Sequence, residues 1–325
     1  MARTEWTDEQ LVEGVAAGDR RALARAISLA ENRDPSAAVL VRELYPRTGR
    51  CHAIGVTGPP GVGKSSLIAA LVQVEREQGR SVGVVSVDPS SPFSHGALLG
   101  DRIRLADHFL DPDVFIRSMG TRGHLGGLAE ATLQALLLLD ASGKDVVYLE
   151  TVGAGQSEIE VIHVADTTLL VLMPGSGDSV QALKAGIMEV PDVIAINKMD
   201  QPGAKAMLTD IRSTLALDQR PDRGPQVPVL LTDALGGGGV PELAVALEQN
   251  LAALRADGEL ERRRGANLAS EVFLLASTRA RAHLEASVAG DPELRRVLES
   301  VQRRELDPLS AVDDLLRTVF RIAGE

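Results

Sequence analysis

Residues 52–66 read HAIGVTGPPGVGKSS, and this stretch decides the fold. Its first six residues form a short apolar run, which predicts a buried strand over 52–57. The residues from Gly58 to Ser65 match the pattern Gly-x-x-x-x-Gly-Lys-Ser, and apolar residues at helical spacing then predict a helix over 64–79. A strand, a glycine-rich turn and a helix in this order are typical of a loop that holds phosphate groups.

Each part of this loop has a chemical reason. Glycines let backbone N–H groups converge on phosphate oxygens, and the new helix presents its positive end. We expect Lys64 to reach the β and γ phosphates of a nucleotide and the Ser65 hydroxyl to bind Mg²⁺. The predicted phosphate-binding residues are Gly58, Pro59, Pro60, Gly61, Val62, Gly63, Lys64, Ser65 and Ser66.

The rest of the middle region alternates short β-branched runs with longer helical patterns, of which 128–140 is one. Such alternation predicts βαβ units and a mostly parallel sheet flanked by helices, so the expected class is α/β, a P-loop NTPase. The candidate strands are 52–57, 82–87, 114–118, 146–150, 168–173, 193–197 and 228–232.

Helical patterns dominate both ends of the chain. Near the N-terminus, Thr7 and Gln10 have the spacing of a capping box, and Pro35 interrupts the helical pattern. Beyond about Leu254 the sequence predicts helices over 259–289, 292–304 and 308–322. The predicted organisation is an N-terminal helical extension, a P-loop domain and a C-terminal helical region, with boundaries 1–48, 49–255 and 256–325.

Composition excludes several classes of function. A net charge of −11 and 2% aromatic residues argue against nucleic-acid binding, which needs a basic face and stacking surfaces. The basic triplet Arg262 to Arg264 is interpreted as solvated helix surface, and the glycine run 236–239 as a flexible connection. The single cysteine, Cys51, excludes an internal disulfide framework, and the six histidines show no zinc-site spacing.

We also expect no membrane partner. No segment approaches the ~18 apolar residues that cross a bilayer, and the N-terminus lacks the apolar region of a signal peptide. Together with the single cysteine, this predicts a cytoplasmic protein.

A later strand carries a base-recognition signal. The run DVIAINKMD ends in Asn197-Lys198-x-Asp200. Guanine presents adjacent N1–H and N2–H₂ donors that one carboxylate accepts together, whereas adenine would leave Asp200 unpaired. Asn197 is expected to tie this loop to the phosphate loop, and the Lys198 stem to lie against the base. The sequence therefore predicts GTP as the ligand.

Two predicted strands end on a carboxylate, SVGVVSVD at Asp88 and VVYLE at Glu150. The carboxyl ends of parallel strands share one edge, where the phosphate loop also lies, so both should face Mg²⁺ and the γ-phosphate. Gly153 leaves room for its N–H to approach the γ-phosphate. The alternative is that both carboxylates are solvated strand exits.

Six stretches together carry a family resemblance over nearly the whole chain: GPPGVGKSS, VDPSSPFSHGALLGDRIRL, RSMGTRGHLGGLA, ETVGAGQSE, VLMPGSGDSVQALKAGIMEV and NKMD. In this combination and order the chain resembles the MeaB/ArgK-type GTPases, chaperones associated with adenosylcobalamin-dependent methylmalonyl-CoA mutase. The resemblance implies Mg²⁺-dependent GTP hydrolysis, a mutase partner, and a homodimer formed through the C-terminal helices. It also implies that residues 174–184 form a switch that reports the nucleotide state to the mutase.

The resemblance also assigns residue roles. It implies catalysis by Lys64, Asp88, Asp101 and Glu150, metal binding by Ser65, Asp88, Asp101 and Glu150, and base reading by Asn197, Lys198 and Asp200. One departure is Thr232-Asp233-Ala234, where the family usually has a Ser-Ala pair at the guanine O6 edge. Asp233 and Ala234 remain candidates for this position, because Ala234 can offer its backbone N–H.

Two residues of GTRGHLGG, Arg122 and His124, have alternative interpretations. Arg122 could be a built-in arginine finger, but a loop salt bridge or partner contact is the preferred interpretation. His124 superficially resembles the histidine of cobalamin sites, but Arg122 stands where that motif has Asp. We therefore expect cobalamin on the partner and not on this chain.

Two other functions stay open. A nickel-insertion GTPase shares the P-loop architecture but would need clustered His and Cys residues as a metal relay. A metabolic kinase, suggested by an older transport-kinase name for the family, would need an acceptor pocket with a base on the substrate hydroxyl.

Overall fold

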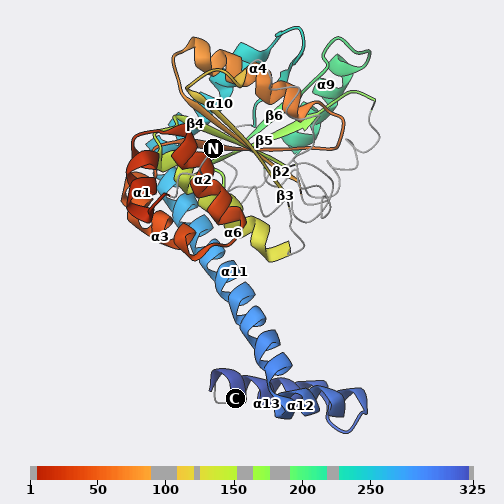
Figure 1. Ribbon diagram of the computed structural model, residues 1–325. Helices are drawn as coiled ribbons and strands as arrows, with labels where there is room; N and C mark the ends of the chain where they lie inside the picture. The colour runs from red at the N-terminus through yellow and green to blue at the C-terminus, as the bar shows by residue number, and fades with distance from the viewer. Residues whose placement is uncertain are drawn as a thin grey trace. The chain divides into compact units, whose positions relative to one another are not determined.

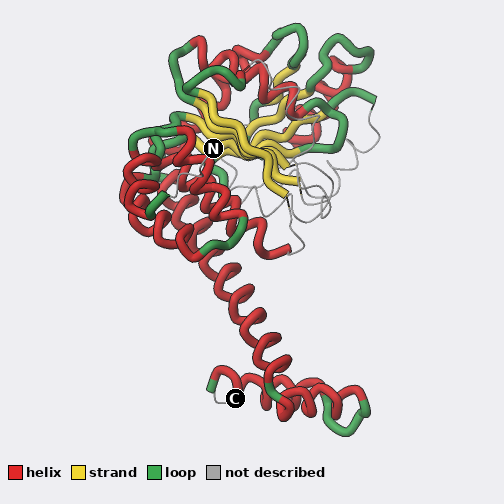
Figure 2. The backbone as a smooth tube through the Cα atoms, in the orientation of Figure 1, coloured by secondary structure: helices red, strands yellow, loops and turns green. Residues whose placement is uncertain are grey.

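The computed structural model describes residues 6–88, 108–120, 125–151, 164–175, 191–217 and 227–321. Within them, seven parallel strands form one sheet in the order β3-β2-β4-β1-β5-β6-β7 (Figures 1 and 2). The strands are β1 (His52–Thr57), β2 (Val82–Asp88), β3 (Val114–Gly120), β4 (Val146–Thr151), β5 (Thr167–Leu172), β6 (Val193–Ile196) and β7 (Val229–Leu231). The predicted α/β class and each predicted strand are confirmed, with ends that differ by at most two residues.

Helices cover both faces of this sheet, which is why its strands are nearly continuous apolar runs. The described helices of this region are α1 (Asp8–Ala16), α2 (Arg20–Glu31), α3 (Pro35–Leu44), η1 (Tyr45–Arg47), α4 (Lys64–Glu77), α6 (Leu125–Ala141), α9 (Ala204–Leu217) and α10 (Val240–Ala256). In Figure 1 the helices α4 and α10 lie on one side of the sheet, and α1, α2, α3 and α6 lie on the other.

The two faces of the sheet pack into separate apolar cores. Along β2, Val84 packs with α4 and α10, whereas the next residue, Val85, packs with α6 and the N-terminal helices. The N-terminal helices bury residues such as Leu23 and Leu40 in that second core. Residues 6–47 therefore cover one face of the sheet.

Local signals explain where the N-terminal helices begin. Thr7 caps α1, and its reciprocal bonds with Gln10 form the predicted capping box. Asp34 caps α3 through the Ser36 amide, and Pro35 occupies the first turn, where its missing N–H costs nothing. Pro35 therefore begins α3 and also interrupts the helical pattern between α2 and α3.

Contacts divide the chain into two units, 1–268 and 269–325. The second contains the later part of α11 (Glu259–Gly290), followed by α12 (Pro292–Gln302) and α13 (Pro308–Phe320), which pack against each other. Asp291 and Asp307 cap the last two helices. Among the described residues, no helix is long and apolar enough to span a membrane.

The interpretation of Arg262 to Arg264 as solvated surface is wrong for two of the three residues. Arg263 pairs with Asp192 at 2.8 Å, and Arg264 pairs with Asp166 at 2.6 Å. These carboxylates lie at the beginning of β6 and β5, so the first turns of α11 are fixed to the sheet. Arg262 is exposed and pairs with a neighbouring glutamate of the same helix. Consecutive residues of a helix face different directions, but the sequence does not show which direction faces the sheet. It therefore does not distinguish the two paired arginines from the exposed one.

Candidate nucleotide-binding site

The glycine-rich loop lies between β1 and α4, as predicted. Gly63 is the N-cap of α4 with φ of 94°, a left-handed conformation that favours glycine. A Cβ at this position would lie 2.5 Å from Nδ2 of Asn197. Glycine therefore allows both the turn into the helix and the close approach of the β6 loop.

Lys64 lies over the loop that precedes it. Its ammonium group donates to the carbonyl oxygens of Gly58 at 2.5 Å and Pro59 at 3.3 Å, and the residue is buried. A charged amine held by neutral carbonyl groups at the mouth of such a loop can exchange them for phosphate oxygens, which bind it more strongly.

Glu150 is 1% exposed, so the interpretation as a solvated strand exit is wrong for this residue. Its carboxylate accepts hydrogen bonds from the hydroxyl of Ser65 at 2.5 Å and from that of Ser86 at 3.2 Å. Ser65 is the second residue of α4, and Ser86 is the register partner of Glu150 on the neighbouring strand. The sheet therefore holds the carboxylate against the start of the phosphate-loop helix.

This arrangement fits a magnesium ion. Mg²⁺ prefers oxygen ligands and usually keeps several waters, which one hydroxyl and one carboxylate at the edge of a phosphate site can hold. Ser65 offers the hydroxyl, and Glu150 is close enough to accept from a water on the ion. Within the described ranges no cluster of three or more His, Cys, Asp or Glu side chains is suited to a metal.

Several predicted residues lie outside what the structure describes. The backbone of Asp88 ends β2 in register with Gly120, but its side chain is not described. The others outside the described residues are Asp101, Gly153, Arg122, His124 and positions 176–184 of the predicted switch.

The predicted base loop is tied to the phosphate loop. Nδ2 of Asn197 donates to the carbonyl oxygen of Val62 at 2.9 Å, the connection that the sequence analysis expects. The amine of Lys198 reaches the carbonyl oxygen of Gly61 at 3.0 Å. Asp200 is exposed two residues later. One loop therefore contacts the phosphate loop and presents a carboxylate to solvent beside it.

The loop after β7 joins the same corner. The backbone N–H of Ala234 donates to Oδ1 of Asn197 at 3.0 Å, so in this structure that amide serves the loop connection. Asp233 closes its own turn through hydrogen bonds with Gly237 and Gly238. A Cβ on Gly239, whose φ is 73°, would lie 2.0 Å from the carbonyl oxygen of Leu231. The glycine run is a built turn and not the flexible connection predicted.

Comparison with known proteins agrees with this geometry. Residues 23–289 match the family described as methylmalonyl Co-A mutase-associated GTPase MeaB. The chain belongs to the MeaB family. It is similar to a putative GTPase of Pyrococcus abyssi, with 43% identity over 316 residues that cover 96% of this chain and 97% of that one. It is also similar to the GTPase ArgK of Escherichia coli, with 34% identity over 321 residues and 96% of both chains covered.

A solved relative has a similar fold. The crystal structure of a LAO/AO transport system kinase superimposes with a TM-score of 0.74 at 29% identity, covering 98% of this chain and 100% of that one. With the phosphate loop, these similarities show that this MeaB-family chain is a P-loop GTPase, a GTP hydrolase.

Sequence reasoning gave no role to two buried polar residues of the MeaB-family site. Ser86 bonds to Glu150, and the hydroxyl of Thr232 lies 3.4 Å from Oδ1 of Asn197. For Ser86 the available signal was a single hydroxyl among apolar residues of β2, because a buried hydroxyl needs a partner. Ser86 lies two positions before Asp88, and this spacing puts both residues on one face of β2.

Proposed function

We propose that this protein is a Mg²⁺-dependent GTPase that acts as a chaperone for adenosylcobalamin-dependent methylmalonyl-CoA mutase, gating cofactor loading and protecting the enzyme. The observation that carries the GTPase part is the buried contact between Ser65 and Glu150 beside Lys64. The family description supports the mutase as partner.

Hydrolysis would proceed by in-line attack of water on the γ-phosphate. Lys64 and the loop amides would neutralise charge that develops on the phosphate oxygens. Ser65, with Glu150 and the end of β2 at Asp88, would hold the magnesium ion. When bound, that ion neutralises charge between the β and γ phosphates. The loop after β6 would select guanine through Asp200, and its bond to Val62 would keep base and phosphate sites in register.

Coupling to the mutase would pass through residues 174–184. Only Pro174 and Gly175 of this segment are described. The segment follows β5, which pairs with β1 next to the phosphate loop, and this neighbourhood supports a link to the nucleotide. Cobalamin would belong to the mutase in this proposal.

A homodimer would form through the C-terminal helices. Apolar side chains on these helices are exposed within the chain, among them Phe273 at 76% and Leu309 at 79%. Contiguous exposed apolar surface marks protein interfaces, and these side chains would contribute to such a surface. Sedimentation equilibrium should give twice the chain mass for the parent protein, and Phe273→Asp with Leu309→Asp should give a monomer. A monomeric parent would contradict the dimer.

The decisive experiment for the chaperone role measures GTP turnover with and without purified methylmalonyl-CoA mutase. Turnover should rise with mutase in the parent and remain near zero in Lys64→Ala under both conditions. The double variant Gln181→Ala and Lys184→Ala should keep intrinsic turnover and lose the increase. No acceleration and no complex with the parent would contradict the chaperone proposal.

A kinase function is the second candidate, favoured by the name of the solved relative. A GTPase and a kinase differ in the acceptor of the γ-phosphate. Inorganic phosphate equal to the GDP formed indicates hydrolysis, whereas a phosphorylated small molecule in place of free phosphate would indicate a kinase.

A further inference from the structure

A second cavity lies at the edge of the sheet opposite the nucleotide site. It has a volume of about 510 Å³, within the range of small-molecule sites. His52 at the beginning of β1 and Val146 at the beginning of β4 contribute to its lining. Since β1 spans six residues, the cavity lies about 20 Å from the phosphate loop. It is therefore a separate cavity from the nucleotide site.

Positive charge exceeds negative charge in this cavity. Four cations line it, Arg50, Arg80, Lys144 and Arg255, against two carboxylates, Asp145 and Glu248. Among the lining residues the excess is two positive charges, and it is one when Glu75, which pairs with Arg80 at 2.6 Å, is also counted. The net charge of the whole protein is −11. A locally positive cavity in an acidic protein selects for anions.

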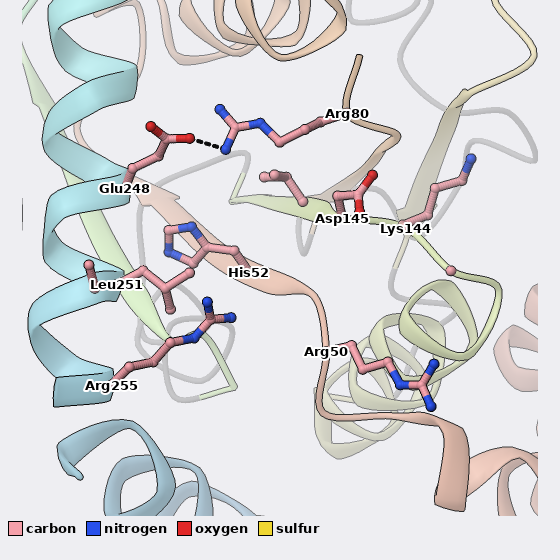
Figure 3. Close-up of a pocket in the computed structure, with 11 residues that line it drawn as sticks. Arg50, His52, Arg80, Lys144, Asp145, Glu248, Leu251 and Arg255 are labelled. Atoms are coloured by element: carbon pink, nitrogen blue, oxygen red, sulfur yellow. Dashed lines mark hydrogen bonds and ion pairs between the residues drawn. The ribbon is translucent and has the colours of Figure 1, made fainter. Parts of the chain in front are cut away.

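The carboxylates do not neutralise all of the cations. Glu248 pairs with Arg80 across the cavity, shown by the dashed line in Figure 3. Asp145 accepts from the amide and hydroxyl of Ser81 at 2.7 and 2.8 Å. The amine of Lys144 donates to the carbonyl oxygen of Asp113 at 2.9 Å.

Two arginines remain available. Arg255 comes from the last turn of α10 and Arg50 from the segment just before β1 (Figure 3). Both are exposed, and neither guanidinium group has a hydrogen-bond or ion-pair partner in the part of the chain that the structure describes. Guanidinium groups bind carboxylate and phosphate through paired donors.

The floor of the cavity is partly apolar and does not supply a charge of its own. Leu251 and Val146 are buried there. The Nε2 atom of His52 lies 2.8 Å from the hydroxyl of Thr167, which donates to Asn250, so this imidazole nitrogen is the donor. Burial is the main cause that lowers the pKa of His52 to about 4, and Arg255, Arg264 and Arg80 also disfavour its protonation. His52 is therefore neutral near pH 7.

We propose that this cavity binds a small aliphatic dianion, with Arg50 and Arg255 as the anion-binding side chains and Leu251 against the carbon skeleton. A dicarboxylate and a phosphate monoester share this chemistry. This cavity is distinct from the nucleotide site, since it lies at the other edge of the sheet.

The test uses the full-length protein saturated with GDP, so that the phosphate loop is occupied. Calorimetric titration with glutarate and with glycerol 3-phosphate should give one saturable site for at least one of them, and the tighter ligand identifies the preferred anionic group. Arg50→Gln and Arg255→Gln should each weaken binding about tenfold, because each removes a charged hydrogen-bond donor. Arg25→Gln is the matched control, as an exposed arginine on α2 outside the cavity, and should bind like the parent.

Proton NMR gives a second, local readout. The chain has six histidines, so their ring signals can be assigned. The His52 signals should shift on titration, while those of His283, which lies in the C-terminal unit, should not. Absence of saturable binding for both probes would overturn the proposal. Binding that survives the double variant Arg50→Gln and Arg255→Gln, or leaves His52 unchanged, would overturn it as well.

Discussion

Glu150 accepts a 2.5 Å hydrogen bond from Ser65, a residue 85 positions earlier in the sequence. Because the carboxylate is buried, its charge acts on the start of α4 and not on solvent. We expect Glu150→Gln to lower the GTPase rate and the apparent Mg²⁺ affinity about tenfold or more, since the neutral amide attracts a hydrated cation less. GDP affinity measured without Mg²⁺ should stay near the parent value.

The matched control is Glu77→Gln, an exposed glutamate near the end of α4. This variant should leave the GTPase rate and the apparent Mg²⁺ affinity unchanged. A Glu150→Gln enzyme with the parent rate and the parent Mg²⁺ dependence would contradict a metal-linked role for this carboxylate.

Asp200 is exposed in the loop that Asn197 fixes to the phosphate loop. Asp200→Asn should weaken GTP binding by about 1–3 kcal/mol, because two guanine donors lose their common acceptor. Xanthosine triphosphate should become the better ligand, since its C2 carbonyl accepts from the asparagine amide. Competition binding of the two nucleotides measures this, with Asp210→Asn on α9 as the control. An unchanged preference for GTP would contradict base reading by Asp200.

Much of the fold could be predicted because its signals are local. The strand runs are apolar and short, and the phosphate-loop pattern fixes the order of β1, loop and α4. The carboxylate of Glu150 was correctly expected at the edge of the sheet that carries this loop, because parallel strands end together.

The remaining features depend on tertiary contacts. Whether Arg263 and Arg264 face solvent or the sheet is set by how α11 docks, which helical periodicity does not determine. The partner of Ser86 lies on another strand, and the opposite cavity joins residues from positions 50 to 255. None of these contacts has both of its partners within a short window of sequence.

The buried His52 makes stability depend on pH. Its pKa is lowered to about 4, chiefly by burial, from 6.5, so between these values the unfolded chain binds more protons than the folded one. Stability from this residue is therefore present above pH 6.5 and is lost as the pH falls toward 4, by about 2 kcal/mol between pH 7 and pH 5.

Urea denaturation at pH 7 and pH 5 measures this loss, with His52→Gln for comparison. The variant should lose about 2 kcal/mol less than the parent over the same interval. Burial raises the pKa of Glu75, which acts in the opposite sense but is common to both proteins and cancels in the difference. Equal losses in parent and variant would contradict a neutral, buried His52.

Arg264 and Arg262 offer a matched pair of substitutions two residues apart on α11. Arg264 holds the buried carboxylate of Asp166 through bonds of 2.6 and 2.7 Å and also donates to the carbonyl oxygens of Gly49 and Cys51. Removing it leaves a buried charge and two carbonyl groups without this donor, so Arg264→Gln should lower the free energy of unfolding by about 2–3 kcal/mol. Arg262 is exposed and pairs within its own helix, so Arg262→Gln should change the free energy of unfolding by less than about 0.5 kcal/mol.

Urea denaturation at pH 7 compares the two variants, and equal losses would show that α11 is not fixed to the sheet by Asp166. The partial exposure of Arg264 weakens the Coulomb attraction but does not hydrate Asp166, which is 3% exposed, and the difference between the two variants should therefore persist at high salt.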